Sequence, residues 1–161
     1  MYWQLSNRSA PQARAIADRH YNRQSIGAVG FVPPGRCLVL VTEDYGALWV
    51  TSFPFAQYVK HQWAGAWVCS AFRRESGPLA SDLIRDALAA TRWKWGDNPL
   101  GMITFIDRSK VIHKRDPGRC YRKAGFREVG ETKGGLLALH IATEDMPPAA
   151  PPFGVTELLA I

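Results

Sequence analysis

The segment with the clearest potential for chemistry is a predicted strand over residues 67–72, followed by a glycine-containing turn and a predicted helix over residues 79–93. The N-terminus of a helix presents unpaired amide groups and the positive end of the helix dipole, so it is a natural site for an anion. Arg73 and Arg74 stand directly before the turn and add positive charge. The residues predicted to bind an anionic group of a cofactor are Arg74, Gly77, Leu79, Ala80 and Ser81. The alternative is a plain strand–helix connection, in which a serine or aspartate of the first turn caps the helix.

Positive charge is concentrated in one part of the sequence. The whole chain has a net charge of +6, and residues 107–127 alone contain eight lysines and arginines against two aspartates. A concentrated basic surface suits a polyanion, which is either a nucleic acid or a phosphorylated cofactor. The alternative is a basic face that only keeps the protein soluble.

Composition limits the class of protein. The chain has 161 residues, of which 47% are hydrophobic and 21% charged, as is typical of one globular domain. No apolar stretch approaches the length of a membrane helix, which is about 20 residues. The first residues of the sequence lack the apolar core of a signal peptide. The three cysteines, Cys37, Cys69 and Cys120, form no close pair that would build a zinc site. These features predict a cytoplasmic protein with reduced thiols and no membrane partner.

Hydrophobic periodicity and turn residues predict the elements that position the chemical groups. A first helix starts at Ser9–Pro11, with Ser9 as its cap, and continues towards residues 20 and 21. Further predicted elements are strands over 37–42, 47–53, 67–72, 100–106, 127–131 and 136–141, and helices over 79–93 and 117–124. This order predicts an α/β (α+β) fold with a mixed, mostly antiparallel central sheet flanked by helices. Residues 1–145 are expected to form one domain, and the proline-rich residues 146–161 a tail packed on it or extending from it.

The second half of the sequence resembles the GNAT superfamily of N-acetyltransferases. In those proteins a tyrosine on a short helix, followed by a Gly-Phe pair and an antiparallel strand, serves as a general acid near the thiol of the acyl donor. Tyr121 and Gly125–Phe126 match this arrangement. The phosphate-binding motif of the superfamily matches in its first half, Arg74–Gly77, whereas its small residue, Ala80, stands one position late. The resemblance implies a GNAT-like sheet, and this departure puts the use of an acyl-coenzyme A in question.

One branch of that superfamily is a more specific match. The stretches Arg19–Tyr21 and Ser70–Glu75, together with Asp107 and the Pro-Gly-x-x-Tyr helix at 117–121, resemble the Mom DNA-modification proteins. Members of that family convert adenine in duplex DNA to a carbamoylmethyl derivative, which protects phage DNA from host restriction. The similarity covers residues 15 to 141, in short pieces.

The resemblance implies a set of catalytic residues, which are His20, Tyr21, Arg73, Asp107 and Tyr121. His20 would take the proton of the amine, because histidine titrates near neutral pH. Asp107 would orient it or contact the amine, Tyr121 would act as an acid or a stacking partner, and Arg73 would hold a phosphate or carboxylate.

Each of these assignments has a structural alternative. His20 could cap helix carbonyls, Asp107 could pair with a nearby arginine, and Tyr121 could lie half-buried against the sheet. Arg73 competes with Arg74, because alternation along a strand turns only one of them inward.

A DNA substrate implies further contacts. An adenine in a duplex must be flipped out before its amine is accessible, and flipped bases stack on aromatic rings. Tyr58 and Trp63, in the loop before the strand at 67–72, are predicted to contact the base. The residues predicted to hold backbone phosphates are Arg108, Lys110, Lys114, Arg115 and Arg119.

The expected partners are double-stranded DNA and a small or carrier-bound group donor, either acetyl-coenzyme A or another acyl or glycyl donor. The participation of a metal and the oligomeric state are left open. Two other functions fit the same residues. One is an acetyl-coenzyme A-dependent N-acetyltransferase acting on a small amine or a protein, and the other is a non-catalytic GNAT-like module that binds nucleic acid.

Overall fold

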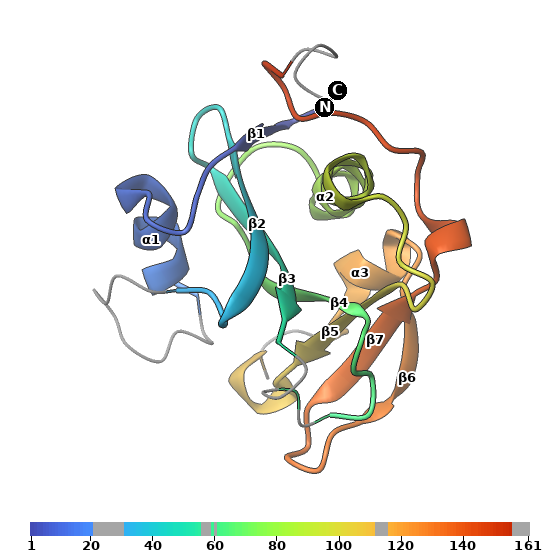
Figure 1. Cartoon of the computed structure of the whole chain (residues 1–161). Helices are drawn as coiled ribbons and strands as arrows, with labels where there is room; N and C mark the ends of the chain where they lie inside the picture. Colours follow the sequence, from blue (N-terminus) through green and yellow to red (C-terminus); the bar gives the residue numbers. More distant parts are fainter. Residues whose placement is uncertain (21–30, 56–58, 60, 112–115, 156–161) are drawn as a thin grey trace.

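The computed structural model of the chain describes residues 1–20, 31–55, 59, 61–111 and 116–155. In this part of the chain, seven strands form one sheet in the order β1-β2-β3-β4-β5-β7-β6 (Figure 1). The strands are β1 (Trp3–Leu5), β2 (Gly35–Thr42), β3 (Ala47–Pro54), β4 (Trp67–Arg74), β5 (Met102–Ile106), β6 (Arg127–Glu131) and β7 (Leu137–Ile141). The α-helices are α1 (Pro11–Asp18), α2 (Ala80–Trp95) and α3 (Arg119–Lys123), and 3-10 turns follow as η2 (Arg108–Val111) and η3 (Thr143–Asp145).

The predicted mixed, mostly antiparallel sheet with flanking helices is confirmed. Strands β4 and β5 are parallel, and every other neighbouring pair is antiparallel. A parallel pair needs a crossover, and α2 supplies it between these two strands. Strand β6 has the predicted bounds, whereas the short strand β1 lies outside the predicted elements.

The start of the first helix differs from the prediction. Ala10, not Ser9, occupies the N-cap position, and no side chain caps this end of α1. The side chain of Asn7 accepts a hydrogen bond from the backbone N–H of Ser9 at 2.9 Å. This bond, and not a bond of the Ser9 side chain, stabilises the turn before the helix. Pro11 is the first helical residue, as predicted. The helix ends at Asp18, before residue 20.

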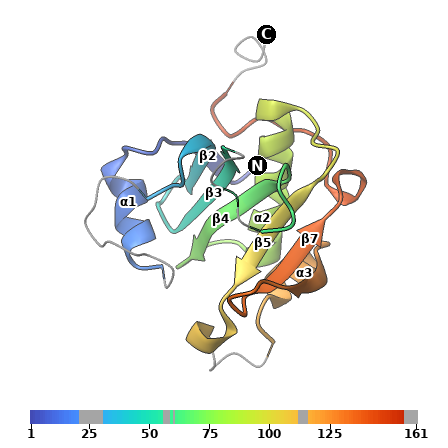
Figure 2. The ribbon, with the colours of Figure 1, turned by 60° about the horizontal axis from the view of Figure 1, so that its bottom comes forward.

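The helices cover both faces of the sheet (Figures 1 and 2). On β2, Leu38 and Leu40 belong to the core beneath α2, while Val39 and Val41 belong to the core beneath α1. From Leu38 to Val41 the strand is apolar without interruption, because this part is buried on both faces. Helix α3 lies on the same face as α2, where it packs against that helix.

The C-terminal segment runs along α2 (Figure 1). Met146 is buried in the core beneath that helix. The N–H of Ala150 donates to the carbonyl of Ala89 at 3.1 Å, and the N–H of Phe153 donates to the carbonyl of Trp3 at 2.7 Å. Through residue 155 this segment is therefore attached to α2 and β1. None of the helices in the described ranges has the length and apolar character that a membrane crossing requires.

Candidate functional site

The parallel strands β4 and β5 pair only over their first residues. Trp67 to Cys69 pair with Met102 to Thr104, and the hydroxyl of Thr104 donates to the carbonyl of Cys69 at 3.2 Å. Beyond that point β4 continues beside β3, and β5 continues beside β7. The register between β3 and β4 also shifts here, because Cys69 and Ala71 pair with consecutive residues of β3 and Ser70 is inserted between them.

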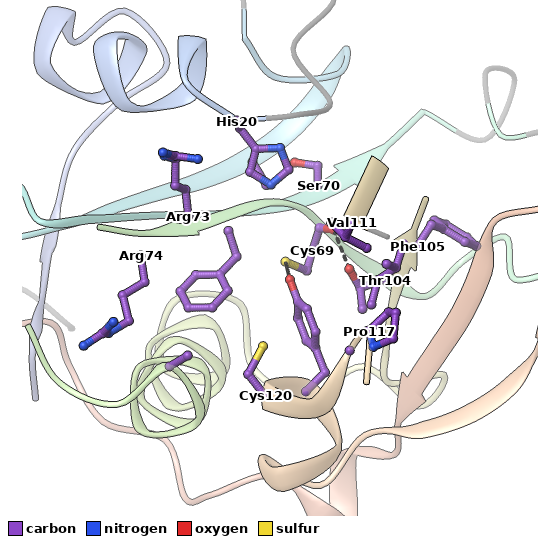
Figure 3. A pocket seen from close by; sticks show the side chains of 16 residues that line it. His20, Cys69, Ser70, Arg73, Arg74, Thr104, Phe105, Val111, Pro117 and Cys120 are labelled. Atoms are coloured by element: carbon purple, nitrogen blue, oxygen red, sulfur yellow. Dashed lines mark hydrogen bonds between the residues drawn. The ribbon is translucent and has the colours of Figure 1, made fainter. Parts of the chain in front are cut away.

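A pocket of about 320 Å³ opens where the two strands diverge. It is lined by the carboxyl-terminal half of β4, by β5, and by residues from the ends of α1, α2, η2 and α3 (Figure 3). Its volume lies at the lower end of the range for small-molecule sites, and its position at the carboxyl ends of parallel strands is where open sheets bind ligands.

The pocket receives side chains from both faces of the sheet. Figure 3 shows His20, Ser70 and Arg73 on the α1 side of β4, and Arg74 on the α2 and α3 side. Tyr121 packs against the core beneath α2. The structure thus brings together three of the predicted catalytic residues, His20, Arg73 and Tyr121. The expectation that only one of the two arginines faces inward is wrong. Both line the pocket, and they lie on opposite faces of β4 because consecutive side chains of a strand alternate.

Tyr121 lies on α3 with its hydroxyl in contact with the thiol of Cys69. The distance between this hydroxyl and the Cys69 sulfur is 3.6 Å. The ring is half-buried and packs edge-on against Phe72 and Phe126. Burial raises the pKa of Tyr121 well above its ordinary value, and burial also raises the pKa of the Cys69 thiol to about 12. Both groups keep their protons at neutral pH, so Tyr121 is suited to donating a proton rather than accepting one.

An ion-paired glutamate, which is not among the predicted site residues, lies next to the pocket. Glu75 follows β4 directly and accepts hydrogen bonds from the Nε atoms of Arg19 and Arg73, at 2.6 and 2.8 Å. Arg19 adds a second bond, from Nη2, at 2.7 Å. Hydrogen bonds from Arg19 and then Arg73 lower the pKa of Glu75 from 4.5 to about 2. A signal that could have indicated this group is the Arg-Arg-Glu run at the end of a predicted strand.

We expect the replacement Glu75→Gln to change the pH dependence of stability. Because the folded-state pKa is lowered, the carboxylate stabilises the fold fully above pH 4.5, and this contribution is lost as the pH falls towards 2. The variant should lose about 1 kcal/mol of unfolding free energy at pH 7, and the difference from wild type should shrink between pH 4.5 and 2. Urea denaturation over this pH range measures it. The exposed Glu43→Gln is the control, and an equal, pH-independent loss in both variants would contradict the assignment.

The turn before α2 differs in detail from the predicted anion site. The helix begins at Ala80 with Leu79 as N-cap residue, and no side chain caps it, so neither Ser81 nor Asp82 has the alternative capping role. The guanidinium of Arg74 donates to the carbonyls of Pro78 and Gly77 at 2.6 and 2.8 Å. These bonds close the turn. Of the predicted anion-binding residues, Arg74 and Ala80 line the pocket, whereas Gly77, Leu79 and Ser81 are not among the lining residues.

Asp107 lies at the carboxyl end of β5 but is not among the residues that line the pocket. Its carboxylate accepts hydrogen bonds from the backbone N–H and the hydroxyl of Ser109, at 3.1 and 2.5 Å. The Ser109 hydroxyl is the main cause of a lowered pKa of Asp107. Among the described residues, no ion pair joins Asp107 to an arginine, and Arg108 pairs instead with Glu131. The observed contacts give Asp107 the role of capping η2, and its predicted catalytic role stays a prediction.

Only some of the residues that are predicted to contact DNA lie in the described part of the chain. Tyr21, Tyr58, Lys114 and Arg115 lie outside the described residues. Of the others, Arg108, Lys110 and Arg119 are exposed near the pocket elements η2 and α3, with Arg108 in an ion pair.

Trp63 is half-buried in an aromatic cluster on the α1 side of the sheet. Its ring centre lies 5.8 Å from that of Phe105, and the ring of His61 lies 4.9 Å from Phe105. Phe105 lines the pocket, so the cluster adjoins it. Burial lowers the pKa of His61, and its Nδ1 accepts the backbone N–H of Trp63 at 3.0 Å. A neutral His61 therefore helps to hold this aromatic surface.

Within the described part of the chain, no group of three or more histidine, cysteine, aspartate or glutamate side chains is placed to hold a metal ion. No family model, curated protein or solved structure matches the chain. The arrangement of the pocket therefore carries the functional argument. It provides a protonated tyrosine, a histidine and arginines around a pocket that is lined from both faces of the sheet.

Proposed function

We propose that the chain is a transferase that modifies the exocyclic amine of adenine in DNA, as the Mom proteins do, on a GNAT-like fold. The observation that carries the proposal is the pocket between β4 and β5, with His20 on the α1 face of the sheet and Tyr121 against the core on the α2 face. A group transfer joins two substrates, and a gap lined from both faces lets an acceptor and a donor meet between the strands.

The arrangement around Tyr121 supports the GNAT-like part of the proposal. The tyrosine lies on the short helix α3, which is followed by Gly125, Phe126 and the antiparallel strand β6. These are the features on which the resemblance to that superfamily rests. The donor would lie on this side, near the start of α2, whose first amides face no capping side chain.

The α1 side suits the acceptor base. The aromatic cluster of His61, Trp63 and Phe105 adjoins the pocket, and aromatic rings stack on unpaired bases with a gain of about 1 to 3 kcal/mol per base. Exposed cations near the pocket, such as Lys110 and Arg119, would contact the DNA backbone.

The residues at the pocket fit the proton transfers of this reaction. A bond forms between the amine nitrogen and the donor carbon, while the bond from that carbon to the leaving group breaks. His20 would take the proton that the amine loses, and Tyr121 would give its proton to the leaving group. Arg73 would hold a negative charge of one of the substrates.

An N-acetyltransferase acting on a small amine or a protein is the second candidate. The uncapped N-terminus of α2 beside Arg74 and Ala80 favours it, because these groups suit a donor with phosphate groups such as acetyl-coenzyme A.

Mass spectrometry of nucleosides from plasmid DNA tests the proposal. The plasmid is isolated from bacteria that express the chain, and His20→Ala serves as the inactive control. A modified deoxyadenosine that appears only with the wild-type protein is the expected result, and its mass identifies the group added. Unmodified DNA in the presence of folded protein would overturn the proposal, and thermal stabilisation by acetyl-coenzyme A would then favour the second candidate.

A further inference from the structure

Three charged residues connect the end of α1 to the end of β4. Arg19 forms a bidentate pair with Glu75, and Arg73 bonds to the same carboxylate through its Nε. We call this group the α1–β4 bridge. The carboxylate of Glu75 is about a quarter exposed and its partners are more exposed, so hydrogen-bond geometry rather than deep burial holds the bridge together.

The α1–β4 bridge lies directly before His20, the candidate base. His20 follows Arg19 directly, and its backbone N–H donates to the carbonyl of Ala17 at 2.9 Å. The face of α1 is fixed by Ala13, Ile16 and Ala17, which pack on the sheet. These apolar contacts lie along the helix, whereas the residues after Asp18 leave it. The Arg19–Glu75 pair adds a polar link between this end of the helix and β4, next to the apolar packing of α1 on Ala71 of that strand.

We propose that Glu75 is a positioning residue, which holds His20 over the pocket through Arg19 and holds Arg73 at its edge. The activity part of this inference rests on the proposed function. A carboxylate next to the binding site of a polyanion opposes binding by repulsion. We therefore expect Glu75 to contribute to the reaction by positioning Arg73, Arg19 and, through Arg19, His20.

The negative charge of Glu75 and its positioning role should affect different kinetic constants, the first KM and the second kcat. Glu75→Gln removes the negative charge, so the KM for DNA should stay the same or fall. The loss of placement should lower kcat by about tenfold or more, since small displacements of a reacting group are costly. A residue that only stabilises the fold would change neither constant in protein that is folded at the assay temperature.

The experiment compares Glu75→Gln, Arg19→Gln and the double variant. Because both residues act through one pair, the double variant should be no slower than the slower single variant. Asp97→Asn is the matched control, because Asp97 forms a similar bidentate pair with Arg92, at 2.8 and 3.1 Å, at the end of α2. It should leave kcat and KM unchanged.

A second readout does not depend on activity. The imidazole signals of His20 are assigned in NMR spectra by comparison with His20→Gln, and their shifts and titration are recorded in each variant. They should move in Glu75→Gln and Arg19→Gln and stay in place in Asp97→Asn. Unmoved His20 signals in Glu75→Gln overturn the inference, whether or not kcat falls. If the wild-type protein modifies no adenine, the proposed function fails, and the His20 signals alone decide whether the bridge positions that residue.

Discussion

Tyr121→Phe is expected to lower the rate of DNA modification by about 10²- to 10⁴-fold, which is the usual contribution of a general acid. The hydroxyl lies 3.6 Å from the Cys69 sulfur in the pocket, and burial keeps it protonated by raising its pKa well above the ordinary value of 10. Phenylalanine keeps the ring and its edge-on contacts with Phe72 and Phe126. The loss of stability should therefore stay near 1 kcal/mol, and KM should change little.

Modified deoxyadenosine formed per enzyme and unit time, quantified by mass spectrometry, measures this effect. Tyr45→Phe is the matched control, since Tyr45 is 47% exposed in the turn between β2 and β3. Between pH 7 and 9 the rate should show no loss from ionisation of Tyr121, because its proton leaves only above pH 10. Full activity of Tyr121→Phe would remove this residue from the reaction.

Gly101→Ala is expected to destabilise the fold by about 3 to 5 kcal/mol. Gly101 precedes β5 and has a φ of 70°, in the left-handed region that favours glycine. A Cβ at this position would lie far inside van der Waals contact with the carbonyl oxygen of Ile141, and 3.2 Å from the Cα of Ala142. Both obstacles are backbone atoms of the neighbouring chain segment, so the strand pairing itself would have to shift.

Gly96→Ala separates the two causes. Gly96 has a similar φ of 76°, and a Cβ there would meet no atom within 4 Å. This variant should lose only about 1 to 3 kcal/mol, which is the cost of a backbone with φ 76° and ψ −157°, a conformation that almost only glycine adopts. Unfolding free energies from urea denaturation at pH 7 provide the comparison. Equal losses in both variants would show that the steric obstacle at Gly101 has no effect.

Most elements of the fold are predictable from short windows of the sequence. The apolar run of β2, the turn before β3, the periodicity of α2 and the apolar run of β7 each carry a local signal, and the structure has all four elements. Strand β1 was missed because only three residues pair, which is too short for a pattern to emerge. The Ser9 cap was wrong because a hydrogen bond of Asn7 organises the preceding turn.

The candidate site is less predictable. His20, Arg73 and Tyr121 were predicted and do line one pocket, while Asp107 caps η2 instead of lining it. The sequence pattern correctly places Asp107 at the end of a strand. The direction of its carboxylate is set by its hydrogen bonds with Ser109. Glu75 is not predictable from a local pattern, because its ion-pair partner Arg19 is 56 positions away in the chain.

Local patterns in the sequence are enough to predict which segments form strands and helices, because periodicity, turn residues and helix-breaking residues act within a few positions. They also show that basic residues, a histidine and a tyrosine are available for chemistry. The contact of Cys69 with Tyr121, 52 positions apart, and the placement of Arg73 and Arg74 around one pocket are instead consequences of the folded chain. These relations follow from the order of strands in the sheet and from an inserted residue in β4, and contacts between distant segments leave no local pattern in the sequence.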